Sequence, residues 1–235
     1  FVLAALEIGG AEKFFYDLIK HLDKEKFAPQ LATVIGGGAL EDDFSALGIP
    51  VHIFGRQRLR YLGGIRQCWQ LYRLFKKEKP QIVHTQLFAA DLWGRLAAKL
   101  AQVTIIITTE QNINYDQSWI RELLKRVTYN FADATVAISS AVKRYARYKY
   151  KVPKEKISVI PNDVDVKDFE KQLSLAQVEK PTKPVILTVG RLVEQKGQKH
   201  ILEAFAKLKN NEKYELWLAG EGTLHADLEQ LAKHL

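Results

Sequence analysis

Cysteine and methionine are the residues that this chain of 235 amino acids nearly lacks, with one cysteine and no methionine. A single cysteine, Cys68, excludes an internal disulfide and a metal cluster held by several cysteines, and it fits a reducing compartment. No apolar run approaches the roughly 20 residues that a membrane-spanning helix needs. A hydrophobic content of 47% and a charged content of 26% are ordinary for a globular protein.

The first glycine turn lacks the spacing of a dinucleotide-binding loop, because no G-x-G-x-x-G follows the first predicted strand. That strand covers residues 1–6, and Gly9 and Gly10 separate it from a helical pattern of apolar residues. The pattern consists of Phe14, Phe15, Leu18, Ile19 and Leu22. Two glycines here let a ligand approach the backbone closely, since no Cβ stands in the way. A tight turn without a ligand is the alternative.

Apolar runs alternate with helical patterns through most of the chain. We expect six more strands before the linker, over 30–35, 48–54, 81–85, 104–109, 134–139 and 157–160. The spacing predicts helices between these strands, over 40–47, 89–100 and 119–131. Another helix is predicted around Ile65, Cys68, Trp69, Tyr72 and Phe75. A last one is capped by Ser140 and runs to Tyr150. We expect the aromatic residues of the helix with Trp69 to lie in the core, with insertion into a membrane as the alternative. This alternation predicts an α/β fold with a doubly wound, mostly parallel sheet.

A further strand–loop–helix unit stands near the end of the chain. Val185–Val189 has the pattern of a strand buried on both faces of a parallel sheet. A polar loop with Gly190, Arg191 and Lys196 follows, and the next strand, 214–218, also ends at a glycine turn. Such loops lie at the carboxyl edge of a sheet, where ligands bind in open α/β folds and helix N-termini attract anions. The three loop residues are therefore candidate ligands of a phosphate or diphosphate, with solvated loop charges as the alternative.

A polar stretch with little strand or helix pattern, residues 165–183, predicts a linker between two domains. We expect an N-terminal domain over 1–164 and the start of a second domain over 184–235. The second piece has only about 50 residues, near the lower limit for an independent core, so we expect it to be incomplete.

The net charge of +8 is concentrated in two segments. Residues 56–79 carry eight cations and one carboxylate, and residues 143–156 carry seven cations and one carboxylate. A basic patch of this kind suits an anionic membrane surface, a nucleic acid or a phosphorylated substrate. Solvated helix faces are the alternative.

Four short motifs resemble those of glycosyltransferase family 4, the "glycosyl transferases group 1". They are GGAE from Gly9, VIPNDVDVKDF from Val159, VGRLVEQKG from Val189 and LAGEGTLHADLEQLA from Leu218. The family's I-P-N-G-V-D segment has glycine where this chain has Asp163, which also tolerates left-handed backbone conformations. The resemblance implies the GT-B type of fold, with two Rossmann-like, doubly wound parallel-sheet domains of which the second is truncated here.

The resemblance also implies roles for the glycine and phosphate loops. In the family, the residues at the positions of Arg191 and Lys196 bind the diphosphate of a nucleotide-sugar. In the family, the glycine loop at the positions of Gly9 and Gly10 faces the donor phosphates across the cleft. The E-x7-E motif that holds the sugar and ribose in the family is not found in this chain.

The candidate catalytic residues His84, Glu110 and Gln111 come from two strand ends that resemble the family's H-x-H and T-x-E-H-N. Gln86 and Gln111 stand where the family has its second histidines. Glutamine can hydrogen-bond a sugar hydroxyl but cannot take a proton. A satisfied core histidine is the alternative for His84, and a structural partner of an arginine is the alternative for Glu110.

The resemblance implies a retaining glycosyltransferase that moves a sugar from a nucleotide-diphosphate sugar to a hydroxyl acceptor in cell-surface polysaccharide or glycolipid synthesis. We expect no cofactor, no metal and no nucleic acid partner. We expect a lipid-linked acceptor, and a cytoplasmic protein that reaches the inner membrane face through residues 56–79 and 143–156. The chain of 235 residues alone is expected to be inactive. A nucleotide-sugar epimerase and a non-catalytic scaffold of the same fold remain alternatives.

Overall fold

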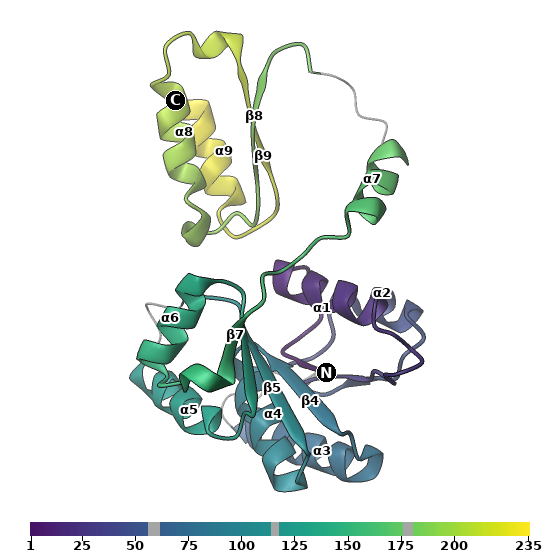
Figure 1. Cartoon of the computed structure of the whole chain (residues 1–235). Helices are drawn as coiled ribbons and strands as arrows, with labels where there is room; N and C mark the ends of the chain where they lie inside the picture. Colours follow the sequence, from purple (N-terminus) through teal and green to yellow (C-terminus); the bar gives the residue numbers. More distant parts are fainter. Residues whose placement is uncertain (56–61, 114–117, 176–180) are drawn as a thin grey trace. The chain divides into compact units, whose positions relative to one another are not determined.

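The computed structural model describes residues 1–55, 62–113, 118–175 and 181–235 (Figure 1). Two compact units make up the chain, Phe1–Phe169 and Glu170–Leu235. The predicted linker over 165–183 is not devoid of regular structure, because its first half forms the helix α7, Val166–Leu175. The backbone N–H of Asp168 donates to the carboxylate of Asp165 at 3.0 Å, which satisfies one of the free donors at the start of that helix.

The first unit contains a seven-stranded sheet in the order β3-β2-β1-β4-β5-β6-β7, and all of its strand pairs are parallel. The strands are β1 (Val2–Leu3), β2 (Leu31–Thr33), β3 (Val51–Ile53), β4 (Ile82–Gln86), β5 (Ile105–Glu110), β6 (Ala134–Ala137) and β7 (Ile157–Val159). The strand order reverses between β1 and β4, as in a doubly wound sheet. Ligands of such sheets bind beyond the carboxyl ends of the strands at this switch point.

Six helices connect the strands of this sheet. They are α1 (Gly10–Lys20), α2 (Glu41–Ala46), α3 (Leu62–Glu78), α4 (Phe88–Ala101), α5 (Trp119–Tyr129) and α6 (Ser140–Lys149). The N-cap of α6 is Ser139 rather than the predicted Ser140, because the Ser139 hydroxyl accepts the backbone N–H of Val142 at 3.2 Å. The turn Lys154–Lys156 leads into β7.

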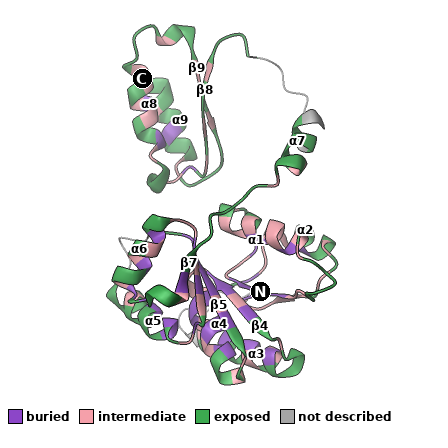
Figure 2. Cartoon of the chain, viewed as in Figure 1, coloured by how far each residue is buried: buried purple, intermediate pink, exposed green. Residues whose placement is uncertain are grey.

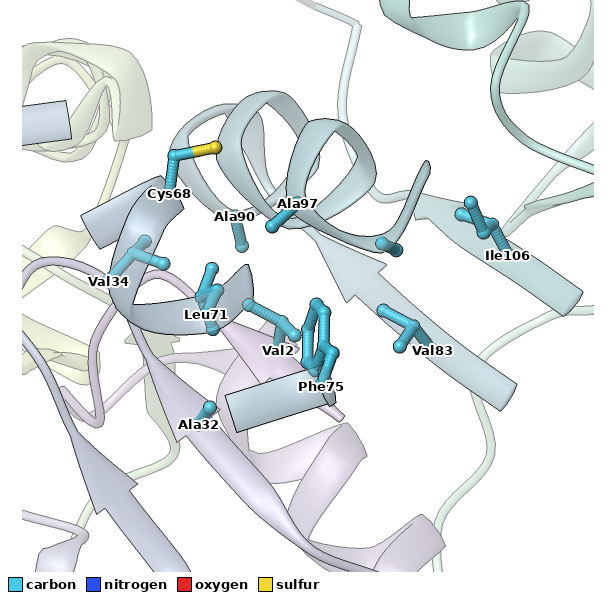
Figure 3. Packing of buried hydrophobic residues seen from close by; sticks show 11 residues of the cluster. Val2, Ala32, Val34, Cys68, Leu71, Phe75, Val83, Ala90, Ala97 and Ile106 are labelled. Carbon is cyan, nitrogen blue, oxygen red and sulfur yellow. The ribbon is translucent and has the colours of Figure 1, made fainter. Parts of the chain in front are cut away.

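The largest core cluster lies between the sheet and helices α3 and α4 (Figure 3). Its members come from four strands or strand ends and from the two helices: Val2, Ala32, Val34, Val83, Ile106, Cys68, Leu71, Phe75, Ala90, Ala97 and Ala98. Phe75 is buried as predicted, whereas Trp69 is 56% exposed, so the expectation that it belongs to the core was wrong. Trp69 instead lies under the guanidinium of Arg73, one turn further along the helix.

The second unit is smaller. It pairs β8 (Val185–Val189) with β9 (Glu215–Ala219) in parallel and packs α8 (Gln198–Ala206) and α9 (His225–His234) around Leu192, Leu202 and Leu228. Short 3₁₀ turns stand at Glu194–Lys196 and Asn211–Lys213. β8 was predicted to be buried on both faces, but Leu187 and Val189 are exposed. The reason is that β9 is its one paired strand in the described unit and the small core involves only part of the strand's side chains.

Candidate functional site

The turn after β1 brings Gly9 and Gly10 to the switch point of the first sheet, where β1 pairs with β4. Gly9 is extended and caps α1, and its carbonyl accepts the backbone N–H of Lys13 at 2.9 Å. A Cβ on Gly10 would meet no atom within 4 Å. Packing within the unit therefore does not require glycine at position 10, whereas a Cβ on Gly9 would meet the carboxylate of Glu12.

His84 lies inside the first unit, in the middle of β4. Its Nε2 is 2.7 Å from the Thr109 hydroxyl of β5, and its ring contacts the rings of Phe1 and Phe15. Burial in these surroundings lowers the pKa of His84 to about 3. The imidazole is therefore neutral at physiological pH, and it cannot donate a proton as an imidazolium there.

Glu110 ends β5 on the other face of the sheet. Its carboxylate accepts the Nζ of Lys125 from α5, in a short contact to Oε1 and at 2.8 Å to Oε2, and both side chains are buried. Burial raises the pKa of this carboxyl, and the ammonium of Lys125 opposes that shift. The structural partner of Glu110 is therefore a lysine rather than the arginine considered from the sequence.

A buried polar cluster surrounds the Glu110–Lys125 pair. Asp91 of α4 accepts the hydroxyls of Thr85 and Thr108 at 2.7 and 2.6 Å, and Arg95 donates to the Asp91 carbonyl at 2.8 Å. The Arg95 guanidinium also lies 4.3 Å from the centre of a tyrosine ring in α5, and Lys125 lies 4.7 Å from the ring of Tyr150. Sequence reasoning missed this cluster; its one local sign is the spacing of four between Asp91 and Arg95, which puts them on one helix face.

The structure does not bring the three candidate catalytic residues together. Neighbouring residues of a strand point to opposite faces, and the observed partners agree: His84 contacts α1, whereas Glu110 contacts α5. Gln111 follows β5, and its Oε1 accepts the Nδ2 of Asn162 at 3.0 Å, a residue of the V-I-P-N-D segment. His84 and Glu110 therefore have separate structural partners, and Gln111 joins two of the segments that the sequence singled out.

Gln86 is the other glutamine at a candidate strand end, and it is the last residue of β4. Its side chain is fully buried, and neither amide atom has a hydrogen-bond partner within the described ranges. The next residue, Leu87, has a positive φ of 65°, which is uncommon for a side chain that is not glycine, and it precedes α4. The switch point thus has two unusual turns, the glycine turn at Gly9 and Gly10 and the β4–α4 turn with a positive φ at Leu87.

Two glycines and a buried glutamine fix the backbone of the loop in the second unit. Gly190 has φ 155° and Gly220 has φ 151°, and a Cβ on Gly220 would collide with the Gly190 carbonyl oxygen. These glycines bring the two strand ends into backbone contact, since Gly190 N–H donates to the Ala219 carbonyl at 2.9 Å. The buried Gln198 donates to the Arg191 carbonyl at 2.8 Å and so fixes the loop to the first turn of α8.

Arg191 and Lys196 are both exposed on this loop. Among the described residues, neither side chain forms an ion pair with a carboxylate within 4.0 Å. Lys196 ends the 3₁₀ turn next to Gly197, which caps α8 in a left-handed conformation. Two cations with no protein anion as partner thus stand beside a helix N-terminus, the arrangement that attracts phosphate groups.

A metal site has no support within the described ranges, where no group of three or more His, Cys, Asp or Glu side chains is placed to hold an ion. In the same ranges, every helix is too short or too polar to cross a membrane.

Two protein-family models match the chain, one in each unit. The model described as Glycosyltransferase Family 4 matches residues 8–168, and the model described as Glycosyl transferases group 1 matches residues 170–235.

Curated bacterial transferases are similar over much of this chain. It is 27% identical over 241 residues to the GalNAc-alpha-(1->4)-GalNAc-alpha-(1->3)-diNAcBac-PP-undecaprenol alpha-1,4-N-acetyl-D-galactosaminyltransferase of Campylobacter jejuni, covering 100% of this chain and 64% of that protein. It is 26% identical over 208 residues to the UDP-Gal:alpha-D-GlcNAc-diphosphoundecaprenol alpha-1,3-galactosyltransferase of Escherichia coli, covering 80% of this chain and 52% of that protein. The chain therefore spans between half and two thirds of the length of these relatives.

Solved structures resemble this chain across nearly its whole length. Anabaena Alr3699/HepE in complex with UDP has a TM-score of 0.72 at 19% identity, with 99% of this chain and 65% of that chain covered. A putative UDP-N-acetylglucosamine 2-epimerase from Listeria monocytogenes has a TM-score of 0.65 at 15% identity, with 99% and 65% covered. At these identities, the likeness concerns the fold alone.

Proposed function

This chain belongs to glycosyltransferase family 4 and has the GT-B type of fold, and from that premise we propose that its protein transfers a sugar from a nucleotide-diphosphate sugar to a hydroxyl acceptor. The observation that carries the proposal is the loop with Arg191 and Lys196. Its two exposed cations and the N-terminus of α8 offer positive potential at the carboxyl end of a parallel strand. A diphosphate leaving group needs such stabilisation, because negative charge grows on it as the sugar departs.

Retention of the anomeric configuration is part of the proposal. A double displacement needs an unpaired carboxylate beside the sugar, and the carboxylate of Glu110 is engaged by Lys125. His84 is held neutral by burial, and the glutamine amides at the strand ends cannot take a proton. Glu110 is therefore unsuited to act as a nucleophile. We propose that the retention implied by the family resemblance proceeds by front-face transfer, in which the donor phosphate assists the incoming hydroxyl and the protein positions the reactants.

The acceptor is proposed to be lipid-linked. Two similar transferases carry undecaprenol-linked diphosphates in their names. The basic segment 143–156 suits a substrate with such a diphosphate or the anionic surface that holds it. We therefore place the activity in cell-surface polysaccharide or glycolipid synthesis, at the inner face of the membrane.

Calorimetric titration of UDP and GDP into the full-length protein tests the donor site. Binding of either nucleotide is expected to weaken by about 100-fold in the double variant Arg191→Ala, Lys196→Ala, because each charge-assisted contact contributes roughly 1.5 kcal/mol or more. The control variant Lys207→Ala, Lys209→Ala removes the same charge from exposed positions beyond the C-terminus of α8.

The outcomes separate the proposal from its alternatives. Equal loss in both double variants would mean that only the net charge matters and would refute the assignment to the loop. If the intact protein binds neither nucleotide, the non-catalytic scaffold becomes the better reading. An epimerase is tested by incubating the protein with UDP-N-acetylglucosamine alone, since isomerisation without an acceptor would contradict a transferase.

A further inference from the structure

Helix α1 ends at Lys20, and His21 is the residue that follows it. Most of α1 is buried or half-buried on the first unit (Figure 2), whereas the side chain of His21 is 52% exposed. The carbonyl groups at the end of a helix lack intrahelical partners and carry a partial negative charge, which attracts cations. The lysine and, when protonated, the histidine thus stand where cations stabilise a helix.

Two carboxylates of the segment that leads into α7 lie against these side chains. The Nζ of Lys20 is 3.4 Å from the carboxylate of Asp168. The Nε2 of His21 is 2.9 Å from the carboxylate of Asp165. Within residues 161–170, these two aspartates are half-buried and all the other residues are exposed. Both aspartates belong to the first unit, so the two pairs hold the end of that unit on α1.

Both ring nitrogens of His21 face oxygen atoms that can only accept a hydrogen bond. Nδ1 lies 2.8 Å from the carbonyl oxygen of Asp17, and Nε2 lies 2.9 Å from the carboxylate of Asp165. A neutral imidazole carries one N–H and can donate to only one of these oxygens, whereas an imidazolium donates to both. The observed arrangement is therefore complete only when His21 is protonated.

The other charged groups around this ring keep their charge near neutral pH. The backbone N–H of Asp168 donates to the Asp165 carboxylate and holds its pKa below the ordinary value of 3.8, with a smaller contribution from His21. On α1, Lys20 stays cationic, and the carboxylate of Asp17 is paired with a lysine of the same helix. Among these groups, only the histidine changes its charge between pH 5 and pH 8.

We propose that the pair of His21 and Asp165 is a pH-sensitive latch that holds the start of α7 on the end of α1. At pH 5, the imidazolium donates to Asp165, and the same carboxylate caps α7 by accepting the N–H of Asp168. At pH 8, the neutral ring keeps only one of its two hydrogen bonds, and the attraction between opposite charges is gone. The end of the first unit then separates more readily from α1. The latch depends on neither the donor site nor the acceptor.

NMR of the full-length protein tests the latch, because two backbone amides report on Asp165. The N–H of Asp168 donates to its carboxylate and the N–H of Phe169 to its carbonyl, both at 3.0 Å. Between pH 5 and pH 8, both amide signals should shift with the same midpoint as the His21 ring. Their order parameters should be lower at pH 8, because the start of α7 is then held less firmly. In about 1 M salt this difference should shrink, since screening weakens an exposed ion pair.

Two variants remove the charge on either side of the latch. His21→Gln replaces the ring with an amide, and Asp165→Asn keeps a side-chain oxygen that caps a helix. Neither new side chain titrates, so the shifts of the two amides between pH 5 and pH 8 should be lost in each variant. The matched control, His200→Gln, removes an exposed histidine of α8 that lies 3.7 Å from Glu203, and it should leave the shifts unchanged.

Three results would overturn the proposal: amides that do not shift between pH 5 and pH 8, shifts that survive His21→Gln, or shifts that disappear in His200→Gln. Equal order parameters at both pH values would do the same, since the segment would then stay fixed whatever the charge of His21. Nucleotide titration of His21→Gln should match that of the native protein, so failure here is distinguishable from failure of the donor-site proposal.

Discussion

Removing the ammonium group of Lys125 should destabilise the first unit in a pH-dependent way. In Lys125→Met, the carboxyl of Glu110 stays buried but loses its cation. Burial already raises the pKa of this carboxyl above its ordinary value of 4.5, and the loss of Lys125 removes the main opposing influence. The carboxyl can avoid a buried charge only by taking up a proton.

The free energy needed to keep the Glu110 carboxyl protonated sets the size of the loss of stability. In the unfolded chain the carboxyl titrates at 4.5, so keeping it protonated in the folded state costs about 1.4 kcal/mol for each pH unit above that value. The penalty is therefore about 0.7 kcal/mol at pH 5 and about 3.4 kcal/mol at pH 7. The direction of the pH dependence follows from the raised pKa of Glu110. The variant is most stable below pH 4.5, and its free energy of unfolding falls as the pH rises toward the folded-state pKa.

Urea unfolding followed by tryptophan fluorescence measures the effect. The experiment is done in a Trp217→Phe background, so that Trp69, Trp93 and Trp119 report on the first unit alone. Each variant is compared with this background at pH 5, 6, 7 and 8. The matched control is Lys149→Met. It breaks the partly exposed pair between Lys149 of α6 and Glu122, which lies on α5 as Lys125 does, and it should cost less than about 1 kcal/mol at every pH.

Two outcomes would refute the reasoning. If Lys125→Met lost the same stability at pH 5 and pH 7, the buried charge of Glu110 would not be the source. The double variant Glu110→Gln, Lys125→Met removes both charges and should show little dependence on pH between these values. A slope as steep in the double variant as in the single one would also contradict the prediction.

Two further predictions concern a turn and a histidine. Gly220→Ala should destabilise the second unit by about 2 kcal/mol or more, because its Cβ would meet the Gly190 carbonyl. Gly190→Ala should cost less, because its Cβ meets only the flexible side chain of Lys196. Urea unfolding read by Trp217 measures both variants, and an equal loss of stability in the two would contradict the prediction. NMR spectra should show a neutral His84 ring at pH 5. Because the folded-state pKa of about 3 lies below the ordinary 6.5, the free energy of unfolding should fall as the pH drops from 6.5 toward 3. The variant His84→Gln should lose this part of the pH dependence of stability, and a His84 ring that titrates near 6.5 would refute the prediction.

The positions of the strands follow closely from the sequence, because buried parallel strands are short apolar runs of definite length. The runs at 104–109 and 134–139 became β5 and β6 with small changes at their ends. The helix α7 was missed although Val166, Phe169 and Leu173 follow helical spacing, because most residues between and around them are polar. Exposure of β8 was missed for a different reason: the same run of Val185–Val189 suits a strand with one covered face or two, and only its neighbours decide.

The candidate site was less predictable, because a side chain's role depends on partners far away in the chain. Glu110 and Lys125 are 15 residues apart, and their pairing depends on where α5 meets the end of β5. The donation from Asn162 to Gln111 joins residues 51 positions apart. Motif resemblance found Gln111 and Asn162 separately, yet no sequence pattern reveals that they touch.

The end of β5 connects helix α5 with the candidate site of the first unit. Glu110 holds the inner face of α5 through Lys125, and the next residue, Gln111, is bonded to Asn162 beyond β7. Consecutive Cα atoms are about 3.8 Å apart, so the residue that fixes α5 adjoins a candidate site residue. A change at Lys125 should therefore affect both α5 and the contact between Gln111 and Asn162.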